Sequence, residues 1–350
     1  MGAGLRRVVG TTLTFTIVLL LTLNATTTLH AQVQPEVKWD IPHYNNTGHF
    51  LILRLQEFAD GVAKRTNGKF IITVHPGESL LKGKQIAPAL LAGRVSIGPV
   101  QNAYADDLFI IQSVTNLPFL LTSTDELRTL AAKEYRDYFA KLLDDKGLKL
   151  LMAYGHPPLQ VFTRSMPMDT VDAWRGNKIR IFTSMMADVC TALKAAPMAI
   201  TYSEVYTALQ RGTIDGYFTS INSHRSAKLY EVSKYVNMWG YSGGDMEYMS
   251  VNKNAWEKLP KNYQQAVLDV VREGQIEEKI WSDLTQADQE SLGFIKTKGV
   301  DVLYPTKAEM EKIRKVTLPI WDQWAAANEK VGARDVLEKM KKSIAAYRVR

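Results

Sequence analysis

The sequence predicts an α/β protein of two domains, and three observations lead to that prediction. Segments with the alternation of strands and segments with the periodicity of helices follow one another along most of the chain. The length of 350 residues, 46% of them hydrophobic and 23% charged, is sufficient for two hydrophobic cores. A third observation is a proline-free stretch at residues 261–296 with helical spacing of its apolar residues, longer than one compact α/β domain needs.

The N-terminal residues have the three-part layout of a secretory signal peptide. Arg6 and Arg7 precede sixteen uncharged residues, and a polar stretch then leads to Leu29-His30-Ala31. We expect cleavage after Ala31, so that residues 1–31 are removed and the formal net charge of +7 falls by two. A membrane anchor is the alternative, although sixteen residues are fewer than the ~20 that span a bilayer. The mature chain is therefore expected to be exported.

The mature chain opens with a β-α-β unit of the kind that builds parallel sheets. A strand is expected at 37–41, then an amphipathic helix at 48–66 that Asn67-Gly68 ends, then a strand at 70–74. The same alternation continues, with helices expected at 83–92, 125–145, 184–193 and 203–211, and strands at 95–100, 148–154, 178–182 and 213–218.

Residues 261–296 depart from this rhythm. Apolar residues keep helical spacing from Val267 to Leu284, and only Gly274 and Gly293 weaken the pattern. We expect one long helix that ties two lobes together. Two ordinary helices broken near Gly274 are the alternative.

Composition argues against several kinds of site. Cys190 is the single cysteine, which excludes an internal disulfide framework and a multi-cysteine metal site, and it is expected to be a buried, inert thiol. The 43 Lys and Arg residues are mixed with 36 Asp and Glu residues along exposed helices, so no nucleic-acid interface is expected. Metal-binding and nucleotide-binding motifs are absent from the sequence, and we expect neither a metal nor a cofactor.

A serine hydrolase is one reading of Gly240-Tyr241-Ser242-Gly243-Gly244, which matches the Gly-x-Ser-x-Gly nucleophile elbow. An elbow lies between a strand and a helix, whereas residues 247–251 alternate like another strand. All six histidines also precede Ser242, while α/β-hydrolases place the histidine after the serine. We therefore interpret the glycines as a bend between strands and keep the hydrolase as an alternative.

Arg180 is the strongest candidate for a functional side chain. It lies in the short apolar strand at 178–182, where Ile179 and Ile181 face the opposite way. A buried guanidinium is costly unless it ends in a cleft or meets an anion, and its planar fork suits a carboxylate. Thr219 and Ser220 follow the strand at 213–218 and are expected to reach the same cleft.

The sequence resembles the solute-binding (DctP-type) subunits of tripartite ATP-independent periplasmic (TRAP) transporters. The resemblance extends over essentially the whole mature chain, and its most specific blocks are Gly176-Asn177-Lys178-Ile179-Arg180, Ser203-Glu204-Val205-Tyr206-Thr207-Ala208-Leu209-Gln210 and Asp215-Gly216. It implies an α/β periplasmic binding protein fold of two lobes around a central cleft, joined by bridging strands and one long spanning helix. The domains are then expected as lobe I at 32–156 plus about 240–283, and lobe II at 157–239 plus about 284–350.

The resemblance also assigns ligand contacts by position. Arg180 matches the arginine that clamps the substrate carboxylate, and Tyr202 falls where an aromatic residue lies against the ligand. Thr219 replaces an asparagine of the family, and Gln160 stands where sialic-acid-type members have a second arginine, so a monocarboxylate is expected. The remaining candidates are polar or aromatic residues near the expected cleft: Gln101, Asn102, Ser220, Tyr44, Tyr104, Trp239 and Tyr241.

The resemblance implies a receptor rather than an enzyme. We expect a periplasmic, monomeric protein that captures a small organic carboxylate, with room for an aromatic or branched acid, by hinge closure. Its partners are then the TRAP membrane permease subunits, to which it delivers the acid. The alternatives are the exported serine hydrolase and a receptor of an ABC or tripartite tricarboxylate uptake system.

Overall fold

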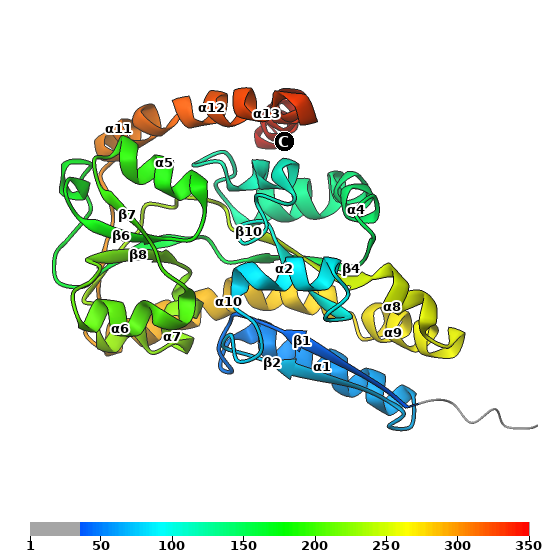
Figure 1. Cartoon of the computed structure of the whole chain (residues 1–350). Helices are drawn as coiled ribbons and strands as arrows, with labels where there is room; N and C mark the ends of the chain where they lie inside the picture. The colour runs from blue at the N-terminus through cyan, green and yellow to red at the C-terminus, as the bar shows by residue number, and fades with distance from the viewer. Residues whose placement is uncertain (1–35, 350) are drawn as a thin grey trace, which may run out of the picture. The chain divides into compact units, whose positions relative to one another are not determined.

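The computed structural model describes residues 36–349, and the predicted signal peptide lies outside them. No helix among the described residues has both the length and the apolar run needed to cross a membrane. The strands of this part of the chain form three sheets, flanked by helices (Figure 1). The fold is therefore α/β, as the sequence predicts.

The smallest sheet belongs to the expected β-α-β unit. Strands β1 (Val37–Pro42) and β2 (Phe70–His75) pair in parallel, and α1 (Phe50–Arg65) connects them. Helix α1 buries Leu51, Leu55 and Phe58, because apolar residues three or four apart share one helical face.

A three-stranded antiparallel sheet lies next to this unit, in the order β3-β10-β4. Its central strand β10 (Asp245–Asn252) comes from far along the chain and inserts between two earlier strands. The other members and the helices near this sheet are β3 (Ile97–Gln101), β4 (Leu148–His156), α2 (Gly83–Leu91), α4 (Arg136–Asp144) and α8 (Lys253–Lys258). The helix expected at 125–145 is divided into α3 (Thr124–Glu126), the π-helical segment η2 (Leu127–Glu134) and α4.

The largest sheet has six strands in the order β11-β9-β5-β8-β6-β7. It is mixed: β6 runs parallel to β7 and β8, whereas β5 runs antiparallel to β8 and β9. Its strands are β5 (Gln160–Thr163), β6 (Lys178–Ile181), β7 (Ala196–Ala199), β8 (Gly216–Thr219), β9 (Tyr235–Asn237) and β11 (Asp301–Leu303). Helices α5 (Ser184–Ala192), α6 (Val205–Gln210) and α7 (Ile221–Ser226) connect them.

Two short segments carry the chain between the three-stranded and the six-stranded sheet. Residues 157–159 lead from β4 to β5, and residues 238–244 lead back from β9 to β10. Short paired crossings of this kind are suited to act as a hinge.

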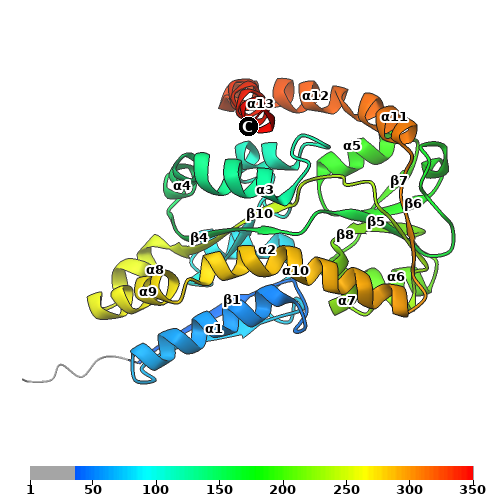
Figure 2. The same ribbon diagram turned by 180° about the vertical axis from the view of Figure 1, so that it is seen from behind.

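The prediction of one long helix at 261–296 is wrong. The alternative, two helices with a break near Gly274, is confirmed. Helix α9 (Lys261–Glu273) ends at Gly274, and α10 (Ile276–Thr297) begins after Gln275, whose φ of 51° is left-handed. A left-handed residue cannot continue a right-handed helix. Helix α10 still bridges the structure, because it contacts α1 and β4 at one part of its length and α7 at another (Figure 2).

The C-terminal helices are α11 (Lys307–Thr317), α12 (Pro319–Ala327) and α13 (Ala333–Arg348). Helices α11 and α12 contact α5, on the side of the six-stranded sheet. Helix α13 instead packs against η2 and the 3-10 helix η1 (Ile110–Asn116), where Arg348 bonds to Glu126. The sequence assigned all of 284–350 to lobe II, whereas α13 contacts segments that were assigned to lobe I. The lobe boundaries stay a prediction.

Candidate functional site

A small cavity lies where residues of the three-stranded and the six-stranded sheet meet. Its volume of about 30 Å³ has room for one or two water molecules. The residues that line it come from many segments: Tyr44, Asn45, Gln101, Tyr104, His156, Leu159, Arg180, Phe182, Tyr202, Thr219, Ser220 and Ser223.

Arg180 is the cationic centre of this cavity and is 1% exposed. Its Nε donates to the carbonyl of Ile200 at 2.9 Å, and Nη1 donates to the carbonyl of Phe218 at 3.4 Å. Nη2 is buried and has no hydrogen-bond partner among residues 36–349. The guanidinium also lies 4.6 Å from the ring centroid of Phe182. The charge thus meets carbonyls, the rings of Phe182 and Tyr202 and the neighbouring Tyr104 hydroxyl, but no acidic group within ion-pair distance in the described part of the chain.

Hydroxyl groups from β8 and the start of α7 lie beside Arg180. Ser220 is the N-cap of α7, and its Oγ accepts a hydrogen bond from the Ser223 N–H at 3.2 Å. The Tyr202 hydroxyl donates to the carbonyl of Ser223 at 2.7 Å, which fixes that aromatic ring against the cavity. Thr219, at the end of β8, completes this wall.

The opposite wall rests on a buried carboxylate. Glu247, in β10, accepts hydrogen bonds from the hydroxyls of Tyr44 and Tyr154 and lies 3.1 Å from His43 Nε2 and 2.9 Å from His156 Nε2. Burial by itself raises the pKa of Glu247, but the two histidines hold that pKa well below its usual value. This cluster fixes Tyr44 and His156, both of which line the cavity.

Asp245 lies next to this cluster and differs from Glu247 in having no partner. It is 2% exposed, and neither of its carboxylate oxygens has a hydrogen-bond partner among the described residues. Burial raises its pKa to about 7, although His156, Asn116 and the Ala103 N–H lie near enough to offset part of that rise.

Direct bonds join the two walls outside the cavity. Glu78, before α2, accepts a hydrogen bond at 3.1 Å from the N–H of Ser203, before α6. Lys82 Nζ donates to Ser203 Oγ at 2.8 Å, and Ser184 Oγ donates to Asp106 Oδ2 at 3.2 Å. These bonds hold the two walls against each other beside the cavity.

The structure brings together six of the residues that the sequence predicts as ligand contacts. They are Arg180, Tyr202, Thr219, Ser220, Tyr44 and Gln101. Tyr104, which the sequence analysis names among the aromatic residues near the cleft, also lines the cavity.

Four predicted contact residues do not line the cavity, and their polar groups are used elsewhere. Gln160 Oε1 accepts from the Gly240 N–H at 2.9 Å, and Asn102 Nδ2 donates to the carbonyl of Gln112 at 2.8 Å. Trp239 Nε1 donates to the carbonyl of Met168 at 2.7 Å, and Tyr241 packs against Phe218. A contact of these four with a ligand stays a prediction.

Five lining residues were not predicted from the sequence: Asn45, His156, Leu159, Phe182 and Ser223. Asn45 directly follows the predicted Tyr44, and Phe182 ends the strand segment that carries Arg180, so proximity to predicted contacts was an available signal. His156 and Leu159 belong to the crossing between β4 and β5, which shows no comparable signal in the sequence.

The segment around Ser242 does not have the geometry of a nucleophile elbow. It connects strand β9 to strand β10, and Gly240 and Gly244 adopt φ values of 58° and 132°. A Cβ at Gly244 would lie 2.3 Å from the carbonyl oxygen of His156, so the bend requires glycine there. Ser242 Oγ is buried, with no hydrogen-bond partner among the described residues. The interpretation of these glycines as a bend between strands is confirmed.

Cys190 lies buried in α5, as expected. Burial raises the pKa of its thiol to about 12, which disfavours the reactive thiolate. The described residues contain no group of three or more His, Cys, Asp or Glu side chains placed to hold a metal ion.

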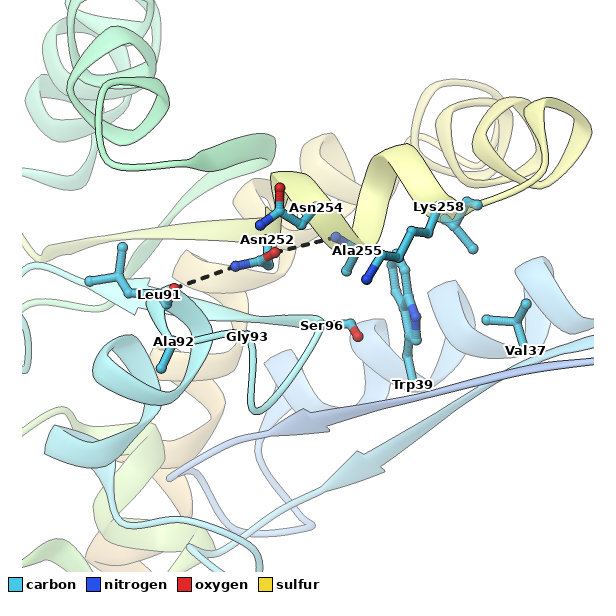
Figure 3. A pocket seen from close by; sticks show the side chains of 11 residues that line it. Val37, Trp39, Leu91, Ala92, Gly93, Ser96, Asn252, Asn254, Ala255 and Lys258 are labelled. Carbon is cyan, nitrogen blue, oxygen red and sulfur yellow. Dashed lines mark hydrogen bonds between the residues drawn. The ribbon is translucent and has the colours of Figure 1, made fainter.

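A wider pocket of about 440 Å³ lies between β1 and α8 (Figure 3). Lys258 is the one charged residue that lines it, and it lies at the end of α8. The side chain of Asn252 is already used, because it bonds the carbonyl of Leu91 and the Ala255 N–H. This pocket has no buried charge at its centre, so we place the candidate site at the smaller cavity around Arg180.

The fold and the cavity together define a two-lobe solute-binding protein. The family model described as bacterial extracellular solute-binding protein, family 7, DctP, matches residues 41–328. The chain belongs to this family. The family consists of solute-binding receptors and is not an enzyme family, and the relatives and solved structures below are TRAP solute-binding proteins.

Relatives and solved structures agree with this membership. The chain is 27% identical over 293 residues to the C4-dicarboxylate-binding periplasmic protein DctP of Rhodobacter capsulatus, covering 80% of this chain and 83% of the relative. A TRAP periplasmic solute-binding protein from Desulfovibrio salexigens with bound orotic acid has a TM-score of 0.80 at 22% identity, covering 89% of this chain and 99% of that one. A Bordetella pertussis extracytoplasmic solute receptor binding pyroglutamic acid also has a TM-score of 0.80, at 24% identity, covering 90% and 100% of the two chains.

Proposed function

We propose that this protein is a periplasmic receptor that binds a small organic acid in the cavity around Arg180 and delivers it to TRAP membrane permease subunits. One observation carries the proposal: a guanidinium that is 1% exposed keeps one buried N–H group without a partner among the described residues. A carboxylate supplies both the missing acceptor and the missing negative charge.

The composition of the cavity wall favours a monocarboxylate. Arg180 is the one arginine or lysine among the lining residues, and His156, the other basic side chain, already lies within hydrogen-bond distance of Glu247. A second carboxylate would find no free cation there. The orotic acid and pyroglutamic acid of the two solved neighbours each carry one carboxyl group, which agrees with this class of ligand.

Binding requires the two walls to separate and close again. The volume of about 30 Å³ is far below the roughly 300 Å³ of small ligand pockets. Entry therefore requires opening of the bonds at Glu78 and Ser203, with the short crossings at 157–159 and 238–244 as the hinge. Closure over the acid would restore these bonds and present a continuous two-lobe surface to the permease, which selects the loaded state.

A thermal-shift comparison of acids with their primary amides tests this proposal. The mature chain is heated with a panel of organic acids, including orotate and pyroglutamate, and with the uncharged amides of the same acids. A ligand at a hundred times its dissociation constant stabilises by ~2.7 kcal/mol. We expect at least one acid to raise the melting temperature while its amide does not. Equal shifts from acid and amide, or no shift from any acid, would overturn the proposal.

A further inference from the structure

Asp245 is a second buried charged group without a hydrogen-bond partner among the described residues. It does not itself line the cavity, but its charge acts on Tyr44 and Tyr104, which do. In the β10–β4 pairing it stands directly opposite His156, whose side chain lines the cavity. Residues directly opposite in an antiparallel pair project from the same face of the sheet. Asp245 therefore projects from the same face of the sheet as His156, which lines the cavity, and as Glu247, two residues further along β10.

Nearby buried donors compensate Asp245 only in part: the Asn116 side chain and the Ala103 N–H lie close to its carboxylate and lower its pKa, but neither oxygen has a partner of ordinary hydrogen-bond geometry among the described residues. The hydroxyls of Tyr44 and Tyr154 donate to Glu247, and His156 Nε2 lies 2.9 Å from the same carboxylate. Gln101, which lines the cavity, likewise has a buried Oε1 without a partner among the described residues. This wall thus has unpaired acceptors at Asp245 and Gln101, whereas the opposite wall has the unpaired Nη2 of Arg180.

We propose that Asp245 is a ligand contact and that the bound acid carries, besides its carboxylate, a hydroxyl or N–H group that donates to Asp245. The inference rests on the proposed function, because it uses the same cavity. A carboxylate with two unpaired, buried oxygens is costly to keep. A ligand donor removes that cost at the moment of binding, so it discriminates strongly between acids that have the donor and acids that lack it.

The test uses pairs of acids that differ in one donor group. The pairs are lactate with propionate, mandelate with phenylacetate, and pyroglutamate with 3-oxocyclopentanecarboxylate, in which a CH₂ group replaces the ring N–H. Binding is measured by thermal shift and calorimetry in a buffer with chelator, so that no cation pairs with Asp245. The variants are Asp245→Asn and Asp245→Ala, and the control is Asp107→Asn, an exposed aspartate of the same side of the cavity.

The expected result is that the wild type and Asp107→Asn prefer the donor-bearing member of at least one pair by tenfold or more. Asp245→Ala loses most of that preference, and Asp245→Asn, which keeps one acceptor oxygen, loses part of it. If both members of every pair bind equally well, or if the preference survives in Asp245→Ala, the inference is overturned and water satisfies Asp245. If no acid binds the wild type at all, the proposed function itself fails, and this inference fails with it.

Discussion

At the scale of single residues, three buried charged groups around the cavity differ in how they are paired. Glu247 has four partners, Arg180 bonds to two carbonyls and has an unpaired Nη2 group, and Asp245 has no partner among the described residues. A buried network that is fully satisfied is rigid, whereas unpaired buried groups cost stability. Glu247 therefore serves to position side chains, and the unpaired groups are the ones available to a ligand.

Asp245 should make the ligand-free protein less stable as the pH rises. Its folded-state pKa of about 7 lies above the ordinary 3.8, so the folded protein holds the proton more tightly than the unfolded chain. The stability from this group is fully present below pH ~4 and is lost as the pH rises to ~7. Between pH 5 and pH 8 the wild type should lose about 2 to 3 kcal/mol relative to Asp245→Asn.

Urea unfolding of both proteins at these two pH values measures this difference. The charged groups that interact with Asp245, His156 and Glu247, are present in both proteins, so the comparison reports what changes when the carboxyl group at position 245 is removed. A difference between the proteins that is the same at both pH values would contradict an elevated pKa for Asp245.

How far the sequence predicts the site depends on the range of the interactions. Arg180 was predictable because a charge between Ile179 and Ile181 in a short apolar strand is a local conflict that the sequence itself displays. The role of Glu247 could not be predicted, because its partners lie between 91 and 204 residues away along the chain. They are His43, Tyr44, Tyr154 and His156. The sequence likewise did not show that backbone groups elsewhere in the chain bond to the polar groups of Gln160, Asn102 and Trp239, whose contact with a ligand stays a prediction.

At the scale of elements, local patterns predicted the helices and strands that are long enough to show a period. Strands β1, β2, β3, β4, β6 and β8 appear within a few residues of their expected positions. Strands β5, β7, β9 and β11 were not predicted, because segments of three or four residues are too short to show a period and are defined by their long-range pairing. Strands β6 and β8 are equally short, but the apolar residues within the expected segments 178–182 and 213–218 indicated them. The break between α9 and α10 depended on one left-handed residue after Gly274.

That break predicts an unusual effect of glycine at Gln275. Its φ of 51° is a conformation that glycine adopts without the cost of a Cβ atom. We expect Gln275→Gly to stabilise the protein by up to about 1 kcal/mol. Gln289→Gly, at an exposed position inside α10, should instead destabilise by about 1 kcal/mol. Chemical denaturation compares the free energies of unfolding of the two variants. A loss of stability in Gln275→Gly would show that the left-handed backbone at position 275 does not strain the protein.

At the scale of the whole described structure, the bonds between the walls imply a receptor held closed by a few polar contacts. Glu78 is buried and joins the loop before α2 to the N–H of Ser203, and Lys82 joins the same residue from outside. These contacts lie outside the cavity, so they affect how long the protein stays closed and not which acid fits.

Removal of Glu78 should therefore accelerate ligand release. A hydrogen bond to a charged group is worth about 1.5 to 3 kcal/mol, so Glu78→Ala should release the acid roughly tenfold faster or more. Lys82→Ala, which leaves the Glu78 loop intact, should have a smaller effect in the same direction. Glu36→Ala, which removes an exposed glutamate paired with Lys69, is the control. Stopped-flow measurement of ligand release tests this, and an unchanged rate in Glu78→Ala would rule out a closing contact.

The central claim is that Arg180 holds the carboxylate of the ligand, and calorimetry on Arg180→Ala tests it most directly. The titration uses an acid that stabilises the wild type, with Arg180→Lys to keep the charge without the planar fork and Arg211→Ala as an exposed arginine control. Loss of a paired, charge-assisted contact should weaken binding by at least roughly a hundredfold in Arg180→Ala. We expect an intermediate loss in Arg180→Lys and none in Arg211→Ala. A dissociation constant for Arg180→Ala within about threefold of the wild-type value, equivalent to less than ~0.7 kcal/mol, would contradict the claim.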